Sequence, residues 1–344
     1  MTGRQSVKQT MTIGIIGCGD FLRVEEPSLR ASSRVKPSVL YDTDPSRAKA
    51  WAGKLGCRVA ASAEEIIGGS DVDIVGVFVP PFARRDLLIR AARAGKHIMT
   101  TKPLAPNVQD CLDMVKAVED SGVACSVLYR RSADPLTETL KGVFESGEIG
   151  TLTLYKQDSV HHFPQWNTWA LDPAKNGGPF MDAVIHNLSA ARYLMGRPTT
   201  SATMFSDNHA QALTCNDTEY LKLDFERAGA AHLFVTWAAD LAVHSTEANF
   251  RDVIEWRAMI TDQRWYVAEG TGADAGYVTA TRSGEKKRWP LKKAGATPYD
   301  SLAAAVEDRK PLPRSSVTIR QAYEDIRIIC EALARKGERV GLKV

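Results

Sequence analysis

Two side chains four residues apart could share a proton-transfer role in this sequence. Asp182 and His186 fall at positions i and i+4 of a helix predicted over Phe180 to Met195, so both should project from one face of that helix. There the carboxylate could orient the imidazole and raise its basicity, which leaves the second ring nitrogen to exchange a proton with a reacting hydroxyl. Spacing alone also fits an ordinary Asp–His pair on a helix surface.

A glycine-containing turn offers a second kind of chemistry, the binding of a dinucleotide. The apolar run from Thr12 to Ile16 predicts a buried strand, GCGDFL at 17–22 follows it directly, and a helix is predicted to begin near Asp20. In dinucleotide folds the first glycine makes the tight turn, and the second lets pyrophosphate approach N–H groups at the helix N-terminus. Leu22 stands where the fingerprint has Gly or Ala, and an isolated G-x-G also fits a plain strand-to-helix turn.

Asp42 closes the next predicted strand, Val35 to Asp42, where an acidic side chain can accept hydrogen bonds from the adenosine ribose. It also suits the role of cap for the helix predicted to begin at Pro45, and since Asp44 lies at the same strand end, both roles could be filled. No Arg or Lys directly follows Asp42 to receive a 2′-phosphate, and its carboxylate would repel one. The sequence therefore favours NAD over NADP.

These residues need a framework that brings strand ends and helix starts together. Short β-branched runs alternate with helical segments over about the first 130 residues, and Asp73 to Val79 is a continuous apolar run, typical of a parallel strand covered on both faces. The alternation predicts an α/β fold with a doubly wound parallel sheet, the Rossmann arrangement, over residues 1–131. The other segments expected there are helices at Pro45–Leu55, Arg84–Ala94 and Asn107–Ser121 and strands at Lys96–Thr101 and Ala124–Tyr129.

The pattern changes after residue 131 to helices followed by a series of short strands. The segment FERAGAAHLFVTW predicts a hairpin with Ala228 and Gly229 at its turn. Helices are expected at Pro135–Glu145, Phe180–Met195 and Val317–Arg335, and strands near 199–207, 217–226, 230–239, 247–256 and 263–269. We therefore predict a C-terminal α+β domain over residues 132–344, built on a large, open, mostly antiparallel sheet.

Length, charge and composition limit the classes of function. A chain of 344 residues exceeds what one hydrophobic core usually supports, so two domains are expected. With 44 Lys and Arg against 41 Asp and Glu, the net charge of +3 does not indicate a nucleic-acid surface. The six cysteines are scattered without a C-x-x-C, and no apolar stretch approaches the roughly 20 residues that span a bilayer. We expect a cytoplasmic protein that binds neither nucleic acid nor membrane.

Three separated stretches resemble the Gfo/Idh/MocA oxidoreductases, the family that contains glucose-fructose oxidoreductase and inositol dehydrogenase. They are the turn at 17–22, AGKHIMTTKPLAPN at 94–107 and NGGPFMDAVIHNLSAARYLMG at 176–196. The spacing and order of the motifs and the residues that flank them agree with the family pattern, and the resemblance covers nearly the whole chain. It implies a Rossmann domain at 1–131 that binds NAD and a domain at 132–344 that binds substrate and forms oligomers.

The resemblance also assigns catalytic roles to three residues. In the family the AGKH strand ends in Glu-Lys-Pro, and its lysine lies near nicotinamide and substrate. Here the triplet is TKP, so Lys102 takes that place and Thr101 replaces the glutamate. A cation at the C-terminal end of a parallel sheet can hydrogen-bond a substrate hydroxyl and favour developing alkoxide charge. The third stretch supplies the family's acid and histidine as Asp182 and His186.

Several positions depart from the family pattern and bear on the shape of the pocket. In the glycine-rich part of the third stretch, Pro179 and Val184 stand in place of two glycines. After the fourth strand, PPFAR at 80–84 replaces the usual Pro-Asn/Asp-x-x-His run, so that Arg84 takes the place of the histidine. These changes can reshape the pocket without removing its chemistry.

The resemblance implies an NAD(H)-dependent oxidoreductase that moves a hydride between nicotinamide and a secondary hydroxyl or ketone of a sugar, sugar acid or cyclitol. Two alternatives stay open because relatives of the family include them. One is a glycoside hydrolase that uses NAD for transient oxidation, and the other is a non-catalytic NAD-binding regulatory protein. The presence of Lys102, Asp182 and His186 together argues against the regulatory protein.

The remaining expectations concern the substrate, metals and assembly. The segment HHFPQWNTW at 161–169 is rich in side chains that stack on sugar faces and hydrogen-bond hydroxyls. Its paired histidines have no cysteine or carboxylate at ligand spacing, so no metal is assigned. A homodimer or homotetramer is expected because an open sheet would otherwise expose one face. The expected cofactor-binding residues are Gly17, Gly19, Asp20, Phe21, Leu22, Asp42, Pro80 and Lys102, and the expected substrate-binding residues are Tyr129, His162, Trp166, Trp169 and Asn187.

Overall fold

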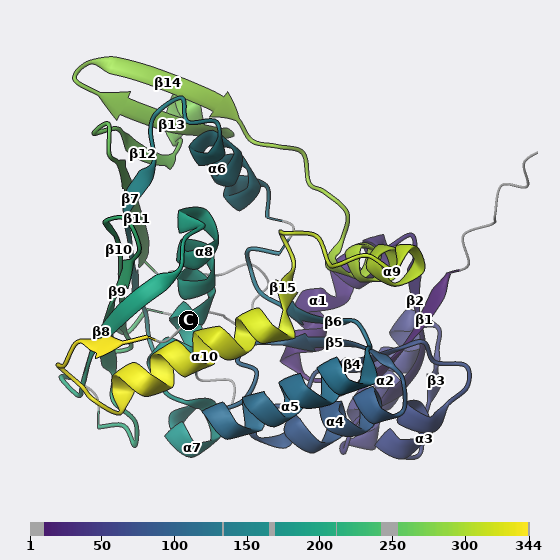
Figure 1. The fold of residues 1–344 in the computed structure, drawn as a ribbon. Coiled ribbons are helices and arrows are strands. Elements are labelled where there is room, and N and C mark those ends of the chain that lie inside the picture. The colour runs from purple at the N-terminus through teal and green to yellow at the C-terminus, as the bar shows by residue number, and fades with distance from the viewer. Residues whose placement is uncertain (1–9, 133, 165–168, 211, 242–253, 343–344) are drawn as a thin grey trace, which may run out of the picture. The chain divides into compact units, whose positions relative to one another are not determined.

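A computed structural model describes residues 10–132, 134–164, 169–210, 212–241 and 254–342 (Figure 1). The chain divides into two compact units. The first unit consists of Met1–Leu104, Gln109–Ala133 and Ala296–Arg320, and the second of Ala105–Val108, Asp134–Gly295 and Gln321–Val344. A segment near the C-terminus thus returns to the first unit, whereas the sequence indicated one boundary, between residues 131 and 132.

The first unit contains the doubly wound sheet that the sequence predicts. Its strand order is β15-β6-β5-β4-β1-β2-β3, with every neighbouring pair parallel except β15 and β6. The elements in chain order are β1 Met11–Ile16, α1 Asp20–Ala31, β2 Val35–Tyr41, α2 Pro45–Leu55, β3 Arg58–Val59, α3 Ala63–Gly68, β4 Ile74–Val77, a 3-10 turn Pro81–Ala83, α4 Arg85–Arg93, β5 His97–Thr101, α5 Val108–Ser121, β6 Cys125–Leu128, α9 Pro298–Asp308 and β15 Val317–Thr318.

Helices cover both faces of this sheet. In Figure 1, α3, α4 and α5 lie on one side of the strands, and α1 and α9 lie on the other. All four residues of β4 are buried as a result, which explains why the strand is continuously apolar rather than alternating. The C-terminal ends of β1, β4 and β5 therefore meet at one edge of the sheet, which is where ligands bind in folds of this kind.

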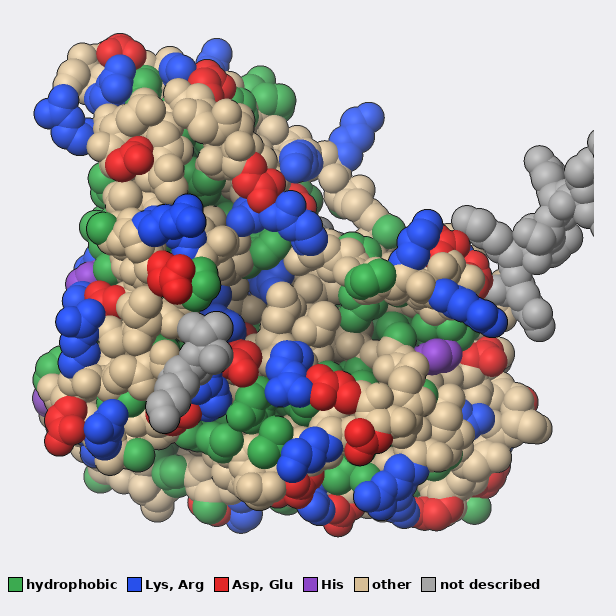
Figure 2. All heavy atoms as spheres, in the orientation of Figure 1, with side chains coloured by type: hydrophobic (Ala, Val, Ile, Leu, Met, Phe, Trp, Pro, Cys, Tyr) green, Lys and Arg blue, Asp and Glu red, His purple; other side chains and the backbone are tan. Residues whose placement is uncertain are grey.

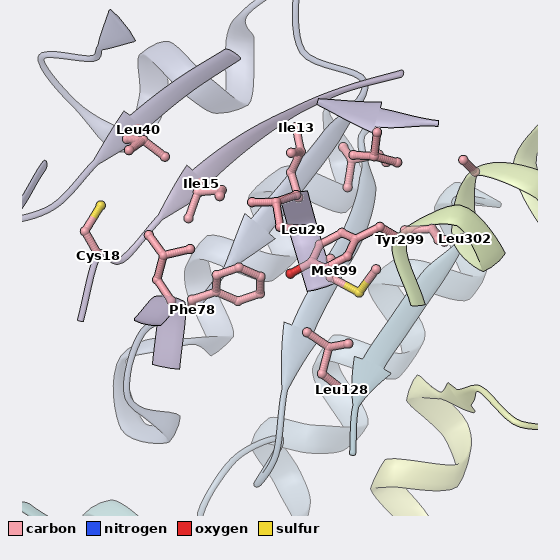
Figure 3. Close-up of a cluster of buried hydrophobic side chains, with 14 of the residues drawn as sticks. Ile13, Ile15, Cys18, Leu29, Leu40, Phe78, Met99, Leu128, Tyr299 and Leu302 are labelled. Atoms are coloured by element: carbon pink, nitrogen blue, oxygen red, sulfur yellow. The ribbon is translucent and has the colours of Figure 1, made fainter. Parts of the chain in front are cut away.

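The helix α9 completes the hydrophobic core of the first unit, although it comes late in the sequence. Figure 3 shows Tyr299 and Leu302 of α9 in the same cluster as Leu29 and Met99. Tyr299 and Leu302 are both fully buried, and burying a leucine side chain stabilises a fold by about 1.5–3 kcal/mol. The helix begins where the Thr297 hydroxyl accepts a hydrogen bond from the backbone N–H of Asp300 at 3.0 Å.

The second unit is built on a mostly antiparallel sheet, which confirms the predicted architecture. The strand order is β14-β13-β12-β11-β7-β10-β9-β8-β16, in which only the central pair β7 and β10 is parallel. The elements are α6 Pro135–Glu145, β7 Leu152–Val160, a 3-10 turn Trp169–Leu171, α7 Pro173–Asn176, a π-helical turn Phe180–Val184, α8 Ile185–Met195, β8 Thr199–Asp207, β9 Thr218–Phe225, β10 Gly229–Thr236, β11 Ile254–Thr261, β12 Tyr266–Glu269, a 3-10 turn Gly272–Asp274, β13 Tyr277–Arg282, β14 Glu285–Pro290, α10 Ile319–Leu333 and β16 Val340–Gly341.

Three details of the second half differ from the sequence-based expectation. The last helix begins at Ile319 rather than Val317, because Val317 and Thr318 pair with β6 as a strand. The hairpin turn lies at residues 226–228, and Gly229 is already the first residue of β10. The strand expected at 247–256 is β11, which starts at Ile254; residues 247–253 lie outside the described part of the chain.

One face of the second sheet is packed and the other is open. Helices α6 and α8 lie against one face in Figure 1, and in the part of the chain that the structure describes no helix lies against the other. Buried and partly exposed side chains alternate along β9 in accordance with this arrangement, and Leu221 and Leu223 are among the buried ones. The open face, as defined by strand register, carries four exposed large apolar side chains, Phe205, Ile254, Trp256 and Tyr266.

Charged side chains of both signs are interspersed on the surface seen in Figure 2. On the hairpin formed by β13 and β14, basic residues pair with acidic neighbours. The Lys287 ammonium lies 2.9 Å from a Glu148 oxygen, and Lys286 pairs with Asp274. Among the described residues, no helix combines the length and the apolar character that a bilayer crossing requires.

Candidate functional site

The turn after β1 has the backbone of a dinucleotide-binding turn. Gly17 has φ +101°, and a Cβ there would lie only 2.6 Å from the carbonyl oxygen of Phe78, so a larger residue would be strained and would clash. Gly19 is the N-cap of α1, has no side-chain capping bond, and has no heavy atom within 4 Å of the place a Cβ would take. Gly19 therefore leaves open space beside the N-terminus of α1, which fits a phosphate.

The next three residues have side chains that are engaged within the protein. Asp20 is exposed, with a carboxylate oxygen 3.6 Å from the guanidinium of Arg23. Phe21 packs edge-to-face on Phe78, with ring centroids 5.1 Å apart. Leu22 is fully buried, so it fills core space that the Gly or Ala of a complete fingerprint would leave to other residues. Because these side chains are engaged elsewhere, residues 20–22 would contribute to cofactor binding through their backbone N–H groups.

Asp42 is held in place by two backbone N–H groups. That of Cys18 donates to Oδ2 at 2.7 Å, and that of Asp44 donates to Oδ1 at 2.8 Å. Asp44 is the cap of α2, since its carboxylate accepts from the N–H of Ser46 at 2.9 Å. The two roles left open by the sequence are thus divided: Asp44 caps the helix, and Asp42 keeps acceptor capacity for a ribose hydroxyl.

The role of Cys18 was missed in the sequence. Its position between the two glycines brings its backbone N–H to the carboxylate of Asp42. Burial, together with the negative charge of Asp42, raises the pKa of the Cys18 thiol to about 12. The thiol is therefore protonated at neutral pH and does not act as a nucleophile.

Pro80 and Lys102 follow β4 and β5, two adjacent parallel strands. The Thr100 hydroxyl donates to the Val77 carbonyl at 2.9 Å, which ties the two strand ends together. Lys102 is half-buried. The Oγ1 atom of Thr101, where the family has glutamate, is buried and has no hydrogen-bond partner among the residues described.

Tyr129 and Arg84 lie at the same edge of the first sheet. Tyr129 is buried directly after β6, whose last residue Leu128 pairs with Thr101. Arg84 is also buried and donates to the carbonyl of Val79 at 2.7 Å. The sequence signalled Arg84 only as a departure from the family pattern, because burial of an arginine depends on the loops packed around it.

The helix predicted over Phe180–Met195 is present, but its first turn is π-helical and not α-helical. Phe180–Val184 is a π-helical turn, and α8 begins at Ile185. The N–H of Phe180 lies at the start of the helix, where no intrahelical acceptor is available, and it donates to a side chain outside the helix. The one-face argument for positions i and i+4 assumed α-helical geometry, so the Asp182–His186 pair stays a prediction.

The side chain that binds this N–H is Glu219, a residue missed in the sequence. Its buried carboxylate accepts from the N–H of Phe180 at 2.6 Å and from the hydroxyl of Ser206 at 2.8 Å. Burial raises the pKa of Glu219 to about 7, although both hydrogen bonds act to lower it. The signal was present, because in the strand TEYLKLDF the glutamate is in phase with the buried leucines.

The expected substrate-binding residues of the second unit lie in three different settings. His162 is half-buried, and its Nδ1 lies 3.1 Å from the Phe163 carbonyl. Trp169 opens a 3-10 turn, and Asn187 is buried on α8, one residue after His186. Trp166 lies outside the described residues. Among the described residues, His, Cys, Asp and Glu side chains form no group of three or more that could hold a metal ion.

The structure thus brings together two sets of expected residues, one in each unit. In the first unit the turn at Gly17, Asp42, Pro80 and Lys102 follow strand ends at the same edge of the sheet. In the second, Asp182 and His186 lie on successive turns of one helical segment.

Comparison with known proteins places this arrangement in a family. A family model described as "Oxidoreductase family, NAD-binding Rossmann fold" matches residues 11–129, and the GFO/IDH/MocA C-terminal domain matches residues 137–271. The chain belongs to the Gfo/Idh/MocA oxidoreductase family. Residues 11–129 form the NAD-binding Rossmann fold of this family.

Relatives of this Gfo/Idh/MocA chain include inositol 2-dehydrogenase of Rhizobium meliloti (strain 1021), which is 29% identical over 205 residues, 56% of this chain and 58% of that protein. The chain spans about half to two thirds of the length of such curated relatives. Among solved structures, aldose-aldose oxidoreductase from Caulobacter crescentus complexed with glycerol has TM-score 0.81 at 21% identity, covering 97% of this chain and 100% of that one. Levoglucosan dehydrogenase in complex with NADH and levoglucosan has TM-score 0.81 at 17% identity, covering 98% and 100%.

Proposed function

We propose that this Gfo/Idh/MocA chain is an NAD(H)-dependent dehydrogenase or reductase that transfers a hydride between nicotinamide and a secondary hydroxyl or ketone of a sugar, sugar acid or cyclitol. The observation that carries the proposal is the uncapped N-terminus of α1 beside a carboxylate, Asp42, that two backbone N–H groups hold in place. Relatives named for inositol, aldose and levoglucosan support this class of substrate.

Cofactor binding is assigned to the turn at 17–22 and to Asp42. The N–H groups at the start of α1 would hold the pyrophosphate, and the side chain of Asp42 would accept hydrogen bonds from the adenosine ribose. A 2′-phosphate would meet the negative charge of Asp42, so NAD is preferred to NADP. The carboxylate of Asp20 would also repel a phosphate, and its pairing with Arg23 reduces that repulsion.

The protein's part in catalysis is proton transfer and stabilisation of charge. Bound NAD supplies or accepts the hydride at its nicotinamide ring. In the oxidation direction His186 would remove the hydroxyl proton, and Asp182 would orient the imidazole. Lys102 would hydrogen-bond the same hydroxyl and stabilise the negative charge that develops on its oxygen.

Recognition of the substrate is assigned to polar and aromatic side chains. Tyr129, His162, Trp169 and Asn187 are proposed to bind hydroxyl groups or stack on a sugar ring. Trp166 joins this set on the basis of its sequence context alone.

A screen for substrates tests the proposal directly. Polyols, cyclitols and sugar acids are mixed with enzyme and NAD, their keto forms with NADH, and the absorbance of NADH is followed. A substrate-dependent change that His186→Ala abolishes supports the proposal. Release of a sugar from a glycoside without net NADH formation would instead show an NAD-dependent hydrolase, and tight NAD binding with no turnover of any compound would favour a regulatory protein.

A further inference from the structure

A buried arginine connects the loops that follow β4 and β5. Arg84 precedes α4, and its side chain is 1% exposed. Its guanidinium donates to the carbonyl of Val79 at 2.7 Å, to that of Leu104 at 3.1 Å, and to that of Pro103. Val79 follows β4, whereas Pro103 and Leu104 directly follow Lys102. One side chain therefore fixes the backbone on which Lys102 is mounted.

Main-chain dipoles stabilise the charge of Arg84, and the neighbouring Cys111 and Tyr129 act to raise its pKa. All three of its acceptors are carbonyl oxygens, and its Nε atom has no hydrogen-bond partner there. Burial lowers the pKa of Arg84 to about 10, so the guanidinium is still protonated at neutral pH. A whole positive charge is therefore held inside the protein at the C-terminal edge of the first sheet.

The next residue provides a contrast. Arg85 has a side chain that is 38% exposed and pairs with Asp86 at 2.7 Å, with Asp110 at 3.3 Å and with Asp113 at 2.5 Å. Its charge is neutralised by three carboxylates and screened by solvent. Arg85 is thus a matched control for the loss of one arginine charge at the start of α4.

A fixed internal cation distinguishes the two forms of a nicotinamide cofactor. The oxidised ring carries a positive charge and the reduced ring is neutral, so the cation repels only the oxidised form, and low-dielectric surroundings screen this repulsion weakly. We propose that Arg84 positions the Lys102 loop and makes the site bind NADH more tightly than NAD⁺. The inference rests on the proposed function for the placement of nicotinamide beside Lys102.

Binding measurements on the full-length chain test this role without a substrate. Dissociation constants are measured for NAD⁺, NADH and ADP-ribose, which lacks nicotinamide, with wild type, Arg84→Met and Arg85→Met. We expect Arg84→Met to lower the ratio of the NAD⁺ constant to the NADH constant by about three- to tenfold. The constant for ADP-ribose should stay within about twofold, and Arg85→Met should leave the ratio near the wild-type value.

A second pair of variants separates charge from positioning. Arg84→Lys keeps the charge but loses the planar fork that reaches several carbonyls, so the ratio should be kept while NAD⁺ and NADH both bind more weakly relative to ADP-ribose. Arg84→Gln should lower the ratio as Arg84→Met does. If circular dichroism shows that Arg84→Met does not fold, the ratio of the NAD⁺ and NADH dissociation constants in Arg84→Lys is compared with that in Arg84→Gln, and this comparison tests the role of the charge.

The outcomes distinguish this inference from the function on which it rests. A folded Arg84→Met or Arg84→Gln protein with the wild-type ratio overturns the role of Arg84 and leaves the cofactor assignment intact. Failure of wild type to bind ADP-ribose contradicts the dinucleotide site at 17–22 and Asp42, and overturns both.

Discussion

Asp42 shows how a single side chain can be prepared for a ligand by its neighbours. Both of its oxygens accept backbone N–H groups, from Cys18 and Asp44, so the carboxylate is oriented before any cofactor arrives. Preorganised groups lose less entropy on binding. The position of the acid could be predicted from the sequence, because it ends an apolar strand. The two N–H contacts could not, since they depend on how two strand ends meet.

Replacing Asp42 should change cofactor preference. We expect wild type to bind NADH more tightly than NADPH, and Asp42→Ala to narrow that difference because the repulsion of a 2′-phosphate is lost. Asp44→Ala is the control: it removes the cap of α2, at a cost of about 1 kcal/mol in stability, and should leave the preference unchanged. Dissociation constants for both cofactors decide, and tighter NADPH binding by wild type would refute the NAD assignment.

Removing the imidazole of His186 should slow turnover more than it weakens cofactor binding. With a substrate found by the screen, His186→Ala is expected to lower kcat by about 10²–10⁴-fold, the contribution of a positioned acid–base group. Asp182→Asn should lose less, because the imidazole remains. Lys102→Ala should lower both kcat and substrate affinity.

Stability controls are needed for these three variants, because a substitution on a helix can act through folding. Thermal melts and circular dichroism provide them. A folded His186→Ala enzyme that keeps most of its turnover would move the proton-transfer role to another group, with Lys102 and His162 as the next candidates.

Two helices with clear local signals at their starts were predicted to the residue. The helices α2 and α6 begin at Pro45 and Pro135, each preceded by a capping aspartate, Asp44 or Asp134. Such signals act within one turn of the chain and can be recognised in a sequence. The bond from the first N–H of the π-helical turn at 180–184 to Glu219 could not be predicted in this way, because Glu219 lies on a distant strand.

The strand β7 and the helix α9 were missed for a related reason. In β7, charged residues such as Lys156 and Asp158 lie on the open face beside Trp256, so the strand lacks the apolar character expected at the centre of a sheet. Residues 303–305 of α9 are alanines, and its apolar pattern is recognisable only with the core that Tyr299 and Leu302 enter.

Glu219 should make stability fall as pH rises from acid to neutral. Its pKa is raised by burial from 4.5 to about 7 in the folded protein. Below pH 4.5 the carboxyl is protonated in both states and its contribution is fully present. Above that pH the unfolded chain releases the proton while the folded protein retains it, so stability declines by roughly 3 kcal/mol as pH passes through 7.

Glu219→Gln should remove this decline, because glutamine keeps an acceptor for the Phe180 N–H without a titrating group. The measurement compares the fall in unfolding free energy between pH 5 and pH 7 in the variant and in wild type. Glu25, whose pKa burial also raises to about 7, is present in both proteins, so its effect cancels. Equal pH dependence in the two proteins would contradict the raised pKa of Glu219.

The open face of the second sheet has a composition suited to self-association. Phe205, Ile254, Trp256 and Tyr266 are 40–57% exposed, and side chains on the neighbouring strands pair internally, as Lys222 does with Asp224 at 2.8 Å. A surface that combines apolar groups with locally neutralised charges can meet its own copy across a twofold axis without like-charge repulsion.

We therefore expect a homodimer or homotetramer that buries this face. Trp256→Glu should shift the protein toward monomer, because a carboxylate would be buried without a partner. Val59→Glu, an exposed apolar position on β3 of the first unit, is the control and should leave the assembly unchanged. Light scattering measures the mass, and a wild-type monomer at micromolar concentrations would rule out this interface.

The place of α9 in the first core has a consequence for the order in which the protein is made. Residues 298–303 complete that core, yet a ribosome adds them only after all of the second sheet up to β14 has been synthesised. Until α9 has been synthesised, the apolar surface around Leu29 and Met99 remains exposed to solvent. A nascent chain with such a surface is a target for chaperones. A fragment stopped at residue 131 would remain in that condition permanently.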